Sequence, residues 1–235
     1  ITRARHLPAV SPALAGAGVV LAAALTLSFS RGSLIGLLVA LAALLWLERR
    51  RIPLGKLLVG VAAVIGTTAA VLYAVVPIFT RVYWYRIIAS VQNFTSLPDK
   101  VLSGRLQSWE LLGDYLLAHP WRALLGIGYK TLAYAGVAGT PVIADNSYLS
   151  ALIETGVFGL AAVIVLNIAI LTAAYRVARS GGPRSALGIW MFCFWAGQCV
   201  QMLTVDLLTY WRVLPAYFCV LALATRKERH EHPVS

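Results

Sequence analysis

Long unbroken runs of apolar residues dominate this sequence and leave the chain few ways to fold. Most of them approach the ~20 residues that an α-helix needs to cross ~30 Å of hydrocarbon, and the second is of marginal length. A segment inside a bilayer has no water to bind its backbone, so it must be a helix or a strand of a closed barrel, and these runs lack the alternation of barrel strands. We predict an all-α, polytopic membrane bundle with about six spans. The runs lie near Leu7–Ser28, Leu34–Leu47, Leu57–Phe79, Tyr148–Ala174, Ala186–Leu203 and Leu207–Leu223.

The balance of residue types also favours a membrane protein. With 60% hydrophobic and only 12% charged residues, the chain is too apolar for a water-soluble domain with an ordinary surface. Cys193, Cys199 and Cys219 fall inside predicted spans, without the spacing of a metal site or a disulfide framework. We interpret them as small buried residues and expect no metal and no cofactor.

The formal net charge is +11, and most of the basic residues stand beside the apolar runs, in alternate connections. Connections rich in Lys and Arg stay in the cytoplasm, so both ends of this chain are predicted to be cytoplasmic. The sequence has no basic stripe interleaved with aromatic residues, so we exclude nucleic acid as a partner. The basic residues of these connections are Arg3, Arg5, Arg49, Arg50, Arg51, Lys56, Arg176, Arg179, Arg184, Arg226, Lys227 and Arg229.

The chain is predicted to form one domain in three parts. Residues 1–78 hold the first three spans, residues 79–145 form a mainly helical loop away from the cytoplasm, and residues 146–235 hold the last three spans and a cytoplasmic tail. Because the chain opens with Ile rather than Met, we expect further spans upstream of it.

The middle of the loop predicts an amphipathic helix at the membrane interface, with Ser103 as its N-cap and an end at His119 and Pro120. Its apolar positions recur at helical spacing: Leu106, Trp109, Leu112 and Leu116.

Several cations on this side of the membrane are candidates for binding an anion. Arg31 lies between the first two apolar runs, where a lone arginine either snorkels to the interface or binds an anion. Arg105 stands near the positive end of the predicted loop helix, where a bound phosphate would compensate its charge. Guanidinium groups match the paired oxygens of a pyrophosphate, although each such residue is also compatible with a plain surface charge. The other candidates that we single out in the loop are Arg81, Arg86, Arg122 and Lys130.

Carboxylates flank the start of the fourth predicted span. Asp145 is either the N-cap of that helix or a general base that takes a proton from an attacking hydroxyl. Glu154, one to two turns further on, either takes part in chemistry or pairs with an arginine to hold the bundle together. Asp206 and Arg212 occupy the last outer turn with Tyr210 and Trp211, and we interpret that group as interfacial anchors, with an ion pair as an option.

Four segments resemble the O-antigen ligase family, which includes related polysaccharide polymerases. They are SRGS at 30–33, SGRLQSW at 103–109, HPWRALLGIGYKTL at 119–132 and DNSYLSALIETGVFG at 145–159. In the last segment Asn146, Gly156 and Gly159 match the family pattern at its spacing, whereas Asp145 stands where that pattern has His.

The resemblance implies a metal-independent glycosyltransferase of the bacterial inner membrane. Family members move a glycan from undecaprenyl-pyrophosphate to an acceptor hydroxyl, such as one on the lipid A core, at the periplasmic face. By resemblance, Arg31, Arg105 and Asp145 are the catalytic residues. A single displacement at the anomeric carbon would invert the configuration of that carbon. We assign substrate binding to Arg81, Arg86, Tyr129, Lys130 and Asn146.

Three alternatives stay open at the level of sequence. The first is an O-antigen or exopolysaccharide polymerase of the same family, since Asp145 replaces the ligase histidine. The second is a transporter of a small anion such as bicarbonate, although transporters usually place polar residues at mid-membrane and here they concentrate at the outer rim. The third is a non-catalytic partner in a cell-envelope assembly.

Overall fold

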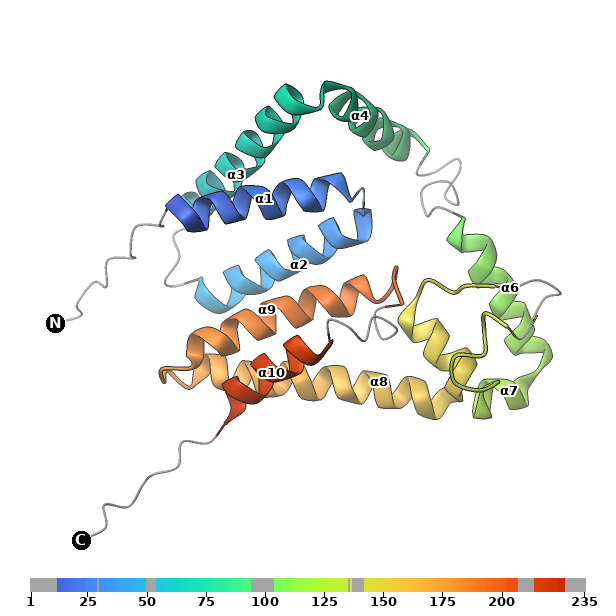
Figure 1. Ribbon diagram of the computed structural model, residues 1–235. Helices are drawn as coiled ribbons and strands as arrows, with labels where there is room; N and C mark the ends of the chain where they lie inside the picture. The colour runs from blue at the N-terminus through green and yellow to red at the C-terminus, as the bar shows by residue number, and fades with distance from the viewer. Residues whose placement is uncertain are drawn as a thin grey trace, which may run out of the picture. The chain divides into compact units, whose positions relative to one another are not determined.

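A computed structural model describes residues 12–28, 30–49, 54–93, 104–134, 136, 142–206 and 214–226, and within these ranges it contains helices and no strands. The all-α prediction is therefore confirmed for the described part of the chain. The chain divides into two compact units, one formed by Ile1–Arg31 and Arg49–Gln92 and the other by Gly32–Glu48 and Asn93–Ser235 (Figure 1).

The first unit contains helices α1 (Pro12–Leu27), α3 (Leu54–Val75) and α4 (Pro77–Gln92). Helix α1 packs against α3, and α4 follows α3 after a break at Val76. Pro77 explains the break, because proline has no N–H for the helical ladder and fits well at the first position of a new helix. The third predicted span therefore ends earlier than the apolar run suggests, and the loop region of the sequence begins with a helix.

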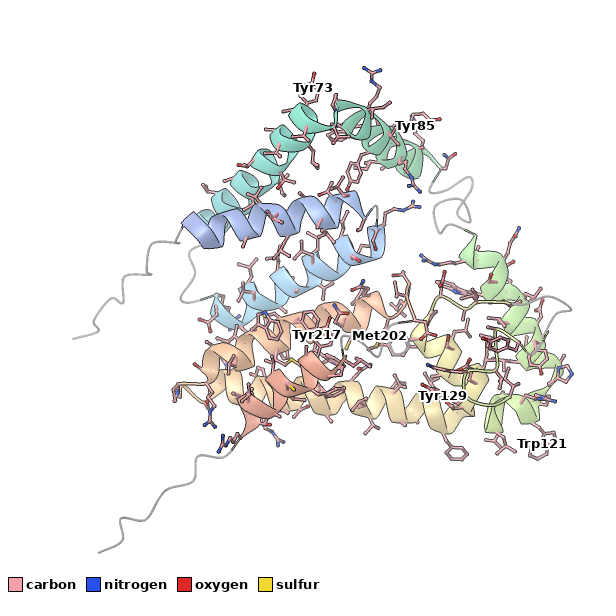
Figure 2. All side chains as sticks on the ribbon, viewed as in Figure 1. Tyr73, Tyr85, Trp121, Tyr129, Met202 and Tyr217 are labelled. Carbon is pink, nitrogen blue, oxygen red and sulfur yellow. The ribbon has the colours of Figure 1, made fainter. Side chains whose placement is uncertain are left out.

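In the second unit α2 (Arg31–Glu48), α8 (Ser147–Arg179), α9 (Ser185–Gln201) and α10 (Leu214–Thr225) form the bundle. Helices α8, α9 and α10 lie side by side around a core cluster (Figures 1 and 2). Helix α2 approaches α9 closely, because a Cβ atom on Gly36 would lie 3.1 Å from the carbonyl oxygen of Gly197. Small residues at such crossings allow helix backbones to pack tightly in a membrane. The buried cluster consists of Ile170, Ala174, Met191, Trp195 and Met202.

A buried polar network links α8 to α9. The indole N–H of Trp195 donates to the side-chain oxygen of Asn167 at 3.0 Å, and the Asn167 amide donates to the Tyr148 hydroxyl at 3.3 Å. That hydroxyl in turn donates to the backbone carbonyl of Cys199 at 2.9 Å. Polar groups surrounded by apolar surface must find such partners, so the network fixes the register of the two helices.

Two described helices, α2 and α8, are long and apolar enough to cross a membrane, and shorter apolar stretches occur at Gly16–Leu27, Val59–Val75 and Leu214–Thr225. Large apolar side chains such as Leu38, Val165 and Ile168 are exposed on α2 and α8. A surface of this kind needs lipid rather than water. The number of about six spans stays a prediction.

Helices α6 (Arg105–Ala118) and α7 (Pro120–Leu125) lie at one end of α8 (Figure 1). The predicted loop helix is thus confirmed, but its N-cap position is Gly104 with φ of 80°, and Ser103 lies outside the described residues. The apolar face of α6 packs on protein, since Leu112 is fully buried against Ile153 and Leu116 packs on the same cluster. This face is therefore covered by the start of α8 and its entry segment, rather than being left for the membrane interface.

Candidate functional site

An ion pair between Arg105 and Asp145 lies where α6 meets the entrance of α8. The Nε atom of Arg105 donates to Oδ2 of Asp145 at 3.3 Å. The side chains are 29% and 47% exposed, so both remain open to a ligand. The structure thus brings together two of the three predicted catalytic residues.

Trp109 and Arg105, one turn apart on α6, hold the same short segment. The indole N–H of Trp109 donates to the backbone carbonyl of Ala144 at 2.7 Å, directly before Asp145. Asp145 has φ of 45°, a left-handed conformation that aspartate tolerates better than most residues. This turn sends the chain into α8 while its carboxylate stays beside Arg105.

The N-cap of α8 is Asn146, not Asp145. Its Oδ1 atom accepts hydrogen bonds from the backbone N–H groups of Tyr148 at 3.0 Å and Leu149 at 3.1 Å. The alternative in which Asp145 caps the helix is therefore wrong, and its carboxylate is directed to Arg105 instead. The side-chain oxygen of Asn146 is therefore occupied by the end of the helix. Substrate binding by Asn146 stays a prediction.

Two glycines allow the loop after α7 to touch α8. Gly156 interrupts α8 with φ of 72° and ψ of −171°, and a Cβ atom there would overlap the carbonyl group of Leu124. Gly126 has φ of 79°, and a Cβ atom there would overlap the carbonyl group of Glu154. The backbone N–H groups of Ile127 and Gly128 donate to the carbonyls of Ile153 and Glu154, each at 2.9 Å. Gly156, one of the two glycines that match the family pattern, therefore has a packing role.

Glu154 fastens the next part of the same loop. Its carboxylate accepts the backbone N–H of Lys130 at 2.9 Å and that of Leu132 at 3.3 Å. The predicted holding role of Glu154 thus acts through backbone N–H groups rather than through an arginine. Lys130 has φ of 57°, and its ammonium group lies 5.6 Å from the ring centroid of Tyr129. Both of these predicted binding residues belong to the same unit as the ion pair.

Asp206, which sequence reasoning assigned to an interfacial anchor, shares the electrostatic environment of the site. Burial raises the pKa of its carboxyl above the usual value, and the charges of Glu154 and Asp145 raise it further. A hydrogen bond from Ser150 and the charge of Lys130 act in the opposite direction. The segment before Asp206 is tied to the start of α8, because the N–H of Ser147 donates to the carbonyl of Met202 at 2.8 Å. The sequence offered one signal for this proximity. Consecutive spans run antiparallel, so the end of α9 returns to the start of α8.

The remaining predicted site residues are divided between the two units. Arg31, Arg81 and Arg86 belong to the first unit, and the Arg105–Asp145 pair belongs to the second. Whether they join one site stays a prediction. Arg122 is exposed on α7. The expected neighbours of Asp206 in the last outer turn, Tyr210, Trp211 and Arg212, lie outside the described residues.

In its described part the protein is thus all-helical, with helices of membrane-crossing length and an arginine–aspartate pair at one end of its bundle. A family model described as O-antigen ligase matches residues 16–164, more than half of the chain. The chain belongs to the O-antigen ligase family. It is accordingly a membrane-associated protein with a ligase-like or polymerase-like role in glycan processing. No match was found among curated proteins or among solved structures.

Proposed function

We propose that this protein transfers a glycan from an undecaprenyl-pyrophosphate carrier to an acceptor hydroxyl, such as one on the lipid A core, at the periplasmic face of the bacterial inner membrane. The observation that carries this proposal is the partly exposed Arg105–Asp145 pair, 3.3 Å apart, in a member of the O-antigen ligase family. The reaction is metal-independent and inverts the anomeric carbon.

Arg105 stabilises the leaving group. When the bond between the sugar and the pyrophosphate breaks, its electron pair departs with the pyrophosphate, so negative charge grows on those oxygens. The contact with Asp145 engages Nε of the guanidinium. The two terminal amino groups of Arg105 then bind pyrophosphate oxygens, with Arg31 as a second guanidinium. Fixed cations at a site of growing negative charge lower the barrier.

Asp145 activates the acceptor. Its carboxylate accepts the proton of the acceptor hydroxyl, and the oxygen forms the new bond to the anomeric carbon on the side opposite the pyrophosphate. The ion pair therefore sets the base and the leaving-group cation next to each other. Asp145 has the place in the chain where the family pattern has histidine, another residue that accepts protons.

The rest of the proposed site binds the long substrate. Tyr129 is exposed next to Lys130, an arrangement that offers a flat aromatic face and a cation to a sugar and a phosphate. Arg81, Arg86 and Asn146 complete the proposed binding residues. In this arrangement residues 79–145 are periplasmic and both ends of the chain are cytoplasmic, as the basic connections favour.

A second candidate is a polymerase of the same family, in which the acceptor is another glycan chain. The observation that favours it is the aspartate at position 145 in place of the family histidine. Both reactions use the same donor and leaving group, so the acceptor alone separates them.

Glycan transfer in a strain that lacks its own ligase tests both candidates. The full-length protein is compared with Arg31→Ala, Arg105→Ala and Asp145→Asn at matched membrane expression. Arg176→Ala removes an equal charge from the exposed last turn of α8 and is the control. We expect glycan on lipid A with the parent and the control, and loss of it with the three site variants. Long chains that are not joined to lipid A would identify a polymerase, and active site variants would overturn the assignment.

A further inference from the structure

Helix α7 and the last turn of α6 expose large apolar side chains. Trp121 and Leu125 are four residues apart, on one face of α7, and they are 75% and 69% exposed. Leu117, in the last turn of α6, is also exposed. Figure 2 shows Trp121 at the outer edge of the second unit, projecting away from the ribbon. Three large apolar side chains are therefore gathered around a helix of six residues.

Helix α8, which is long enough to cross the membrane, also exposes apolar side chains near its contact with α7. Helix α7 packs against α8 where the carbonyl group of Leu124 meets Gly156. The two residues after that glycine, Val157 and Phe158, are exposed as well, Phe158 at 69%. Exposed apolar side chains therefore stand on both helices close to this contact, on α7 and on the part of α8 directly after the kink.

The charge pattern of α7 suits a phospholipid surface. Its sequence, PWRALL, contains one charged residue, the exposed Arg122, and no carboxylate. Aromatic residues and arginines are enriched where acyl chains meet headgroups, since one end of such a side chain is apolar and the other binds phosphate or water.

We propose that α7 and the kink of α8 form one anchoring surface that lies in the outer leaflet, at the boundary between headgroups and acyl chains. The occupant of this surface is the bilayer itself. Because the loop after α7 also carries Tyr129 and Lys130 and is bonded to α8 beside the entrance segment, the anchor sets the height of the Arg105–Asp145 pair above the hydrocarbon. The anchor depends on this apolar surface and not on the reaction.

Fluorescence of the full-length protein in lipid nanodiscs tests the anchor. The emission lost in the conservative variant Trp121→Phe is taken as the Trp121 signal. It is measured in phosphatidylcholine, in phosphatidylcholine brominated on the upper part of its acyl chains, and with acrylamide in the water. We expect bromine to quench most of the Trp121 signal and acrylamide to quench little of it. Trp46→Phe is the positive control, because Trp46 is exposed on the apolar helix α2. Quenching of Trp121 by acrylamide and not by bromine would overturn the anchor.

A second measurement needs no substitution. The unaltered protein is illuminated in a bilayer that contains a phosphatidylcholine with a photoreactive group near its glycerol, and the labelled peptides are mapped. We expect adducts on residues 117–125 and on Val157 or Phe158. Adducts on the part of α8 that follows Phe158, with none on residues 117–125, would show that α7 does not contact the bilayer.

Discussion

The indole of Trp109 holds the carbonyl of Ala144 at 2.7 Å, and this bond sets the backbone from which the Asp145 carboxylate reaches Arg105. One turn of α6 therefore carries both the cation and the group that positions its partner. Trp109→Phe keeps an aromatic ring and removes the N–H donor together with part of the indole ring system. A hydrogen bond of this kind contributes about 0.5–1.5 kcal/mol, so we expect a small fall in unfolding temperature and a larger fall in turnover. A variant with unchanged turnover would show that the Ala144 contact does not position Asp145.

Asp145→His tests whether the aspartate takes the role of the family histidine. Both side chains accept a proton, so we expect Asp145→His to retain measurable transfer with a shifted pH dependence. Asp145→Asn is nearly isosteric and is not a base, and we expect it to lower the rate by about 10²–10⁴-fold. The rate of transfer from a lipid-linked donor, measured against pH, checks both. Equal activity of the Asn and His variants would argue for a role in orientation alone.

Gly156→Ala should destabilise the protein. The backbone conformation at this glycine costs any other residue about 1–3 kcal/mol, and the added Cβ atom would also overlap the Leu124 carbonyl group. The matched control is Gly113→Ala in α6, where nothing lies within 4 Å of the added atom. Alanine is the better helix former there by up to ~1 kcal/mol. The unfolding temperature in detergent should therefore fall for Gly156→Ala and rise for Gly113→Ala.

Glu154→Ala should loosen the loop without unfolding the bundle. The carboxylate accepts two backbone N–H groups, those of Lys130 and Leu132, and the substitution leaves both without that acceptor. We expect faster hydrogen exchange at these two amides, while exchange of the buried core of α9 stays as it was. Glu154→Gln keeps one acceptor oxygen and should give an intermediate rate. Unchanged exchange at Lys130 and Leu132 would show that the Glu154 carboxylate does not hold this loop.

Asp206 predicts a dependence of stability on pH. Because its pKa is raised in the folded protein, the folded state holds this proton more tightly than the unfolded state does. Its contribution to stability is complete below the ordinary carboxyl pKa, about 3.9, and is lost as the pH rises through the folded value. Asp206→Asn should therefore flatten the fall in unfolding temperature over this window. Asp114→Asn, which removes an exposed carboxylate of α6, is the control.

The sequence predicted the bundle helices well. The apolar runs at Tyr148–Ala174 and Ala186–Leu203 correspond to α8 and α9, because lipid-facing helices are apolar along their whole length. It did not predict α4 as a separate helix, since the run that ends at Phe79 hides the break that Pro77 makes. It also assigned the apolar face of α6 to the membrane interface. An amphipathic pattern shows that a helix has a face to bury, but not whether lipid or protein covers it.

At the site, the resemblance named Arg105 and Asp145 among the catalytic residues but did not predict that they form an ion pair. Forty residues separate them, and only the return of α6 to the entrance of α8 brings them together. Asn146 and Asp145 are both good N-cap residues, and the choice between them depends on the left-handed turn at Asp145. The sequence did not place Asp206 near the site, because its neighbours Asp145, Ser150 and Glu154 come from the start of another helix.

The kink at Gly156 also has a mechanical consequence. A helix that is interrupted leaves its last carbonyl groups without partners, and in lipid such groups would be costly. The N–H groups of Ile127 and Gly128 bind two of the carbonyls next to the kink, so the loop completes the broken end of the helix. Separating loop and helix would expose both carbonyls at once. The start of α8 and this loop are therefore coupled through their backbones, and a change that displaces one of them must displace the other or break these bonds.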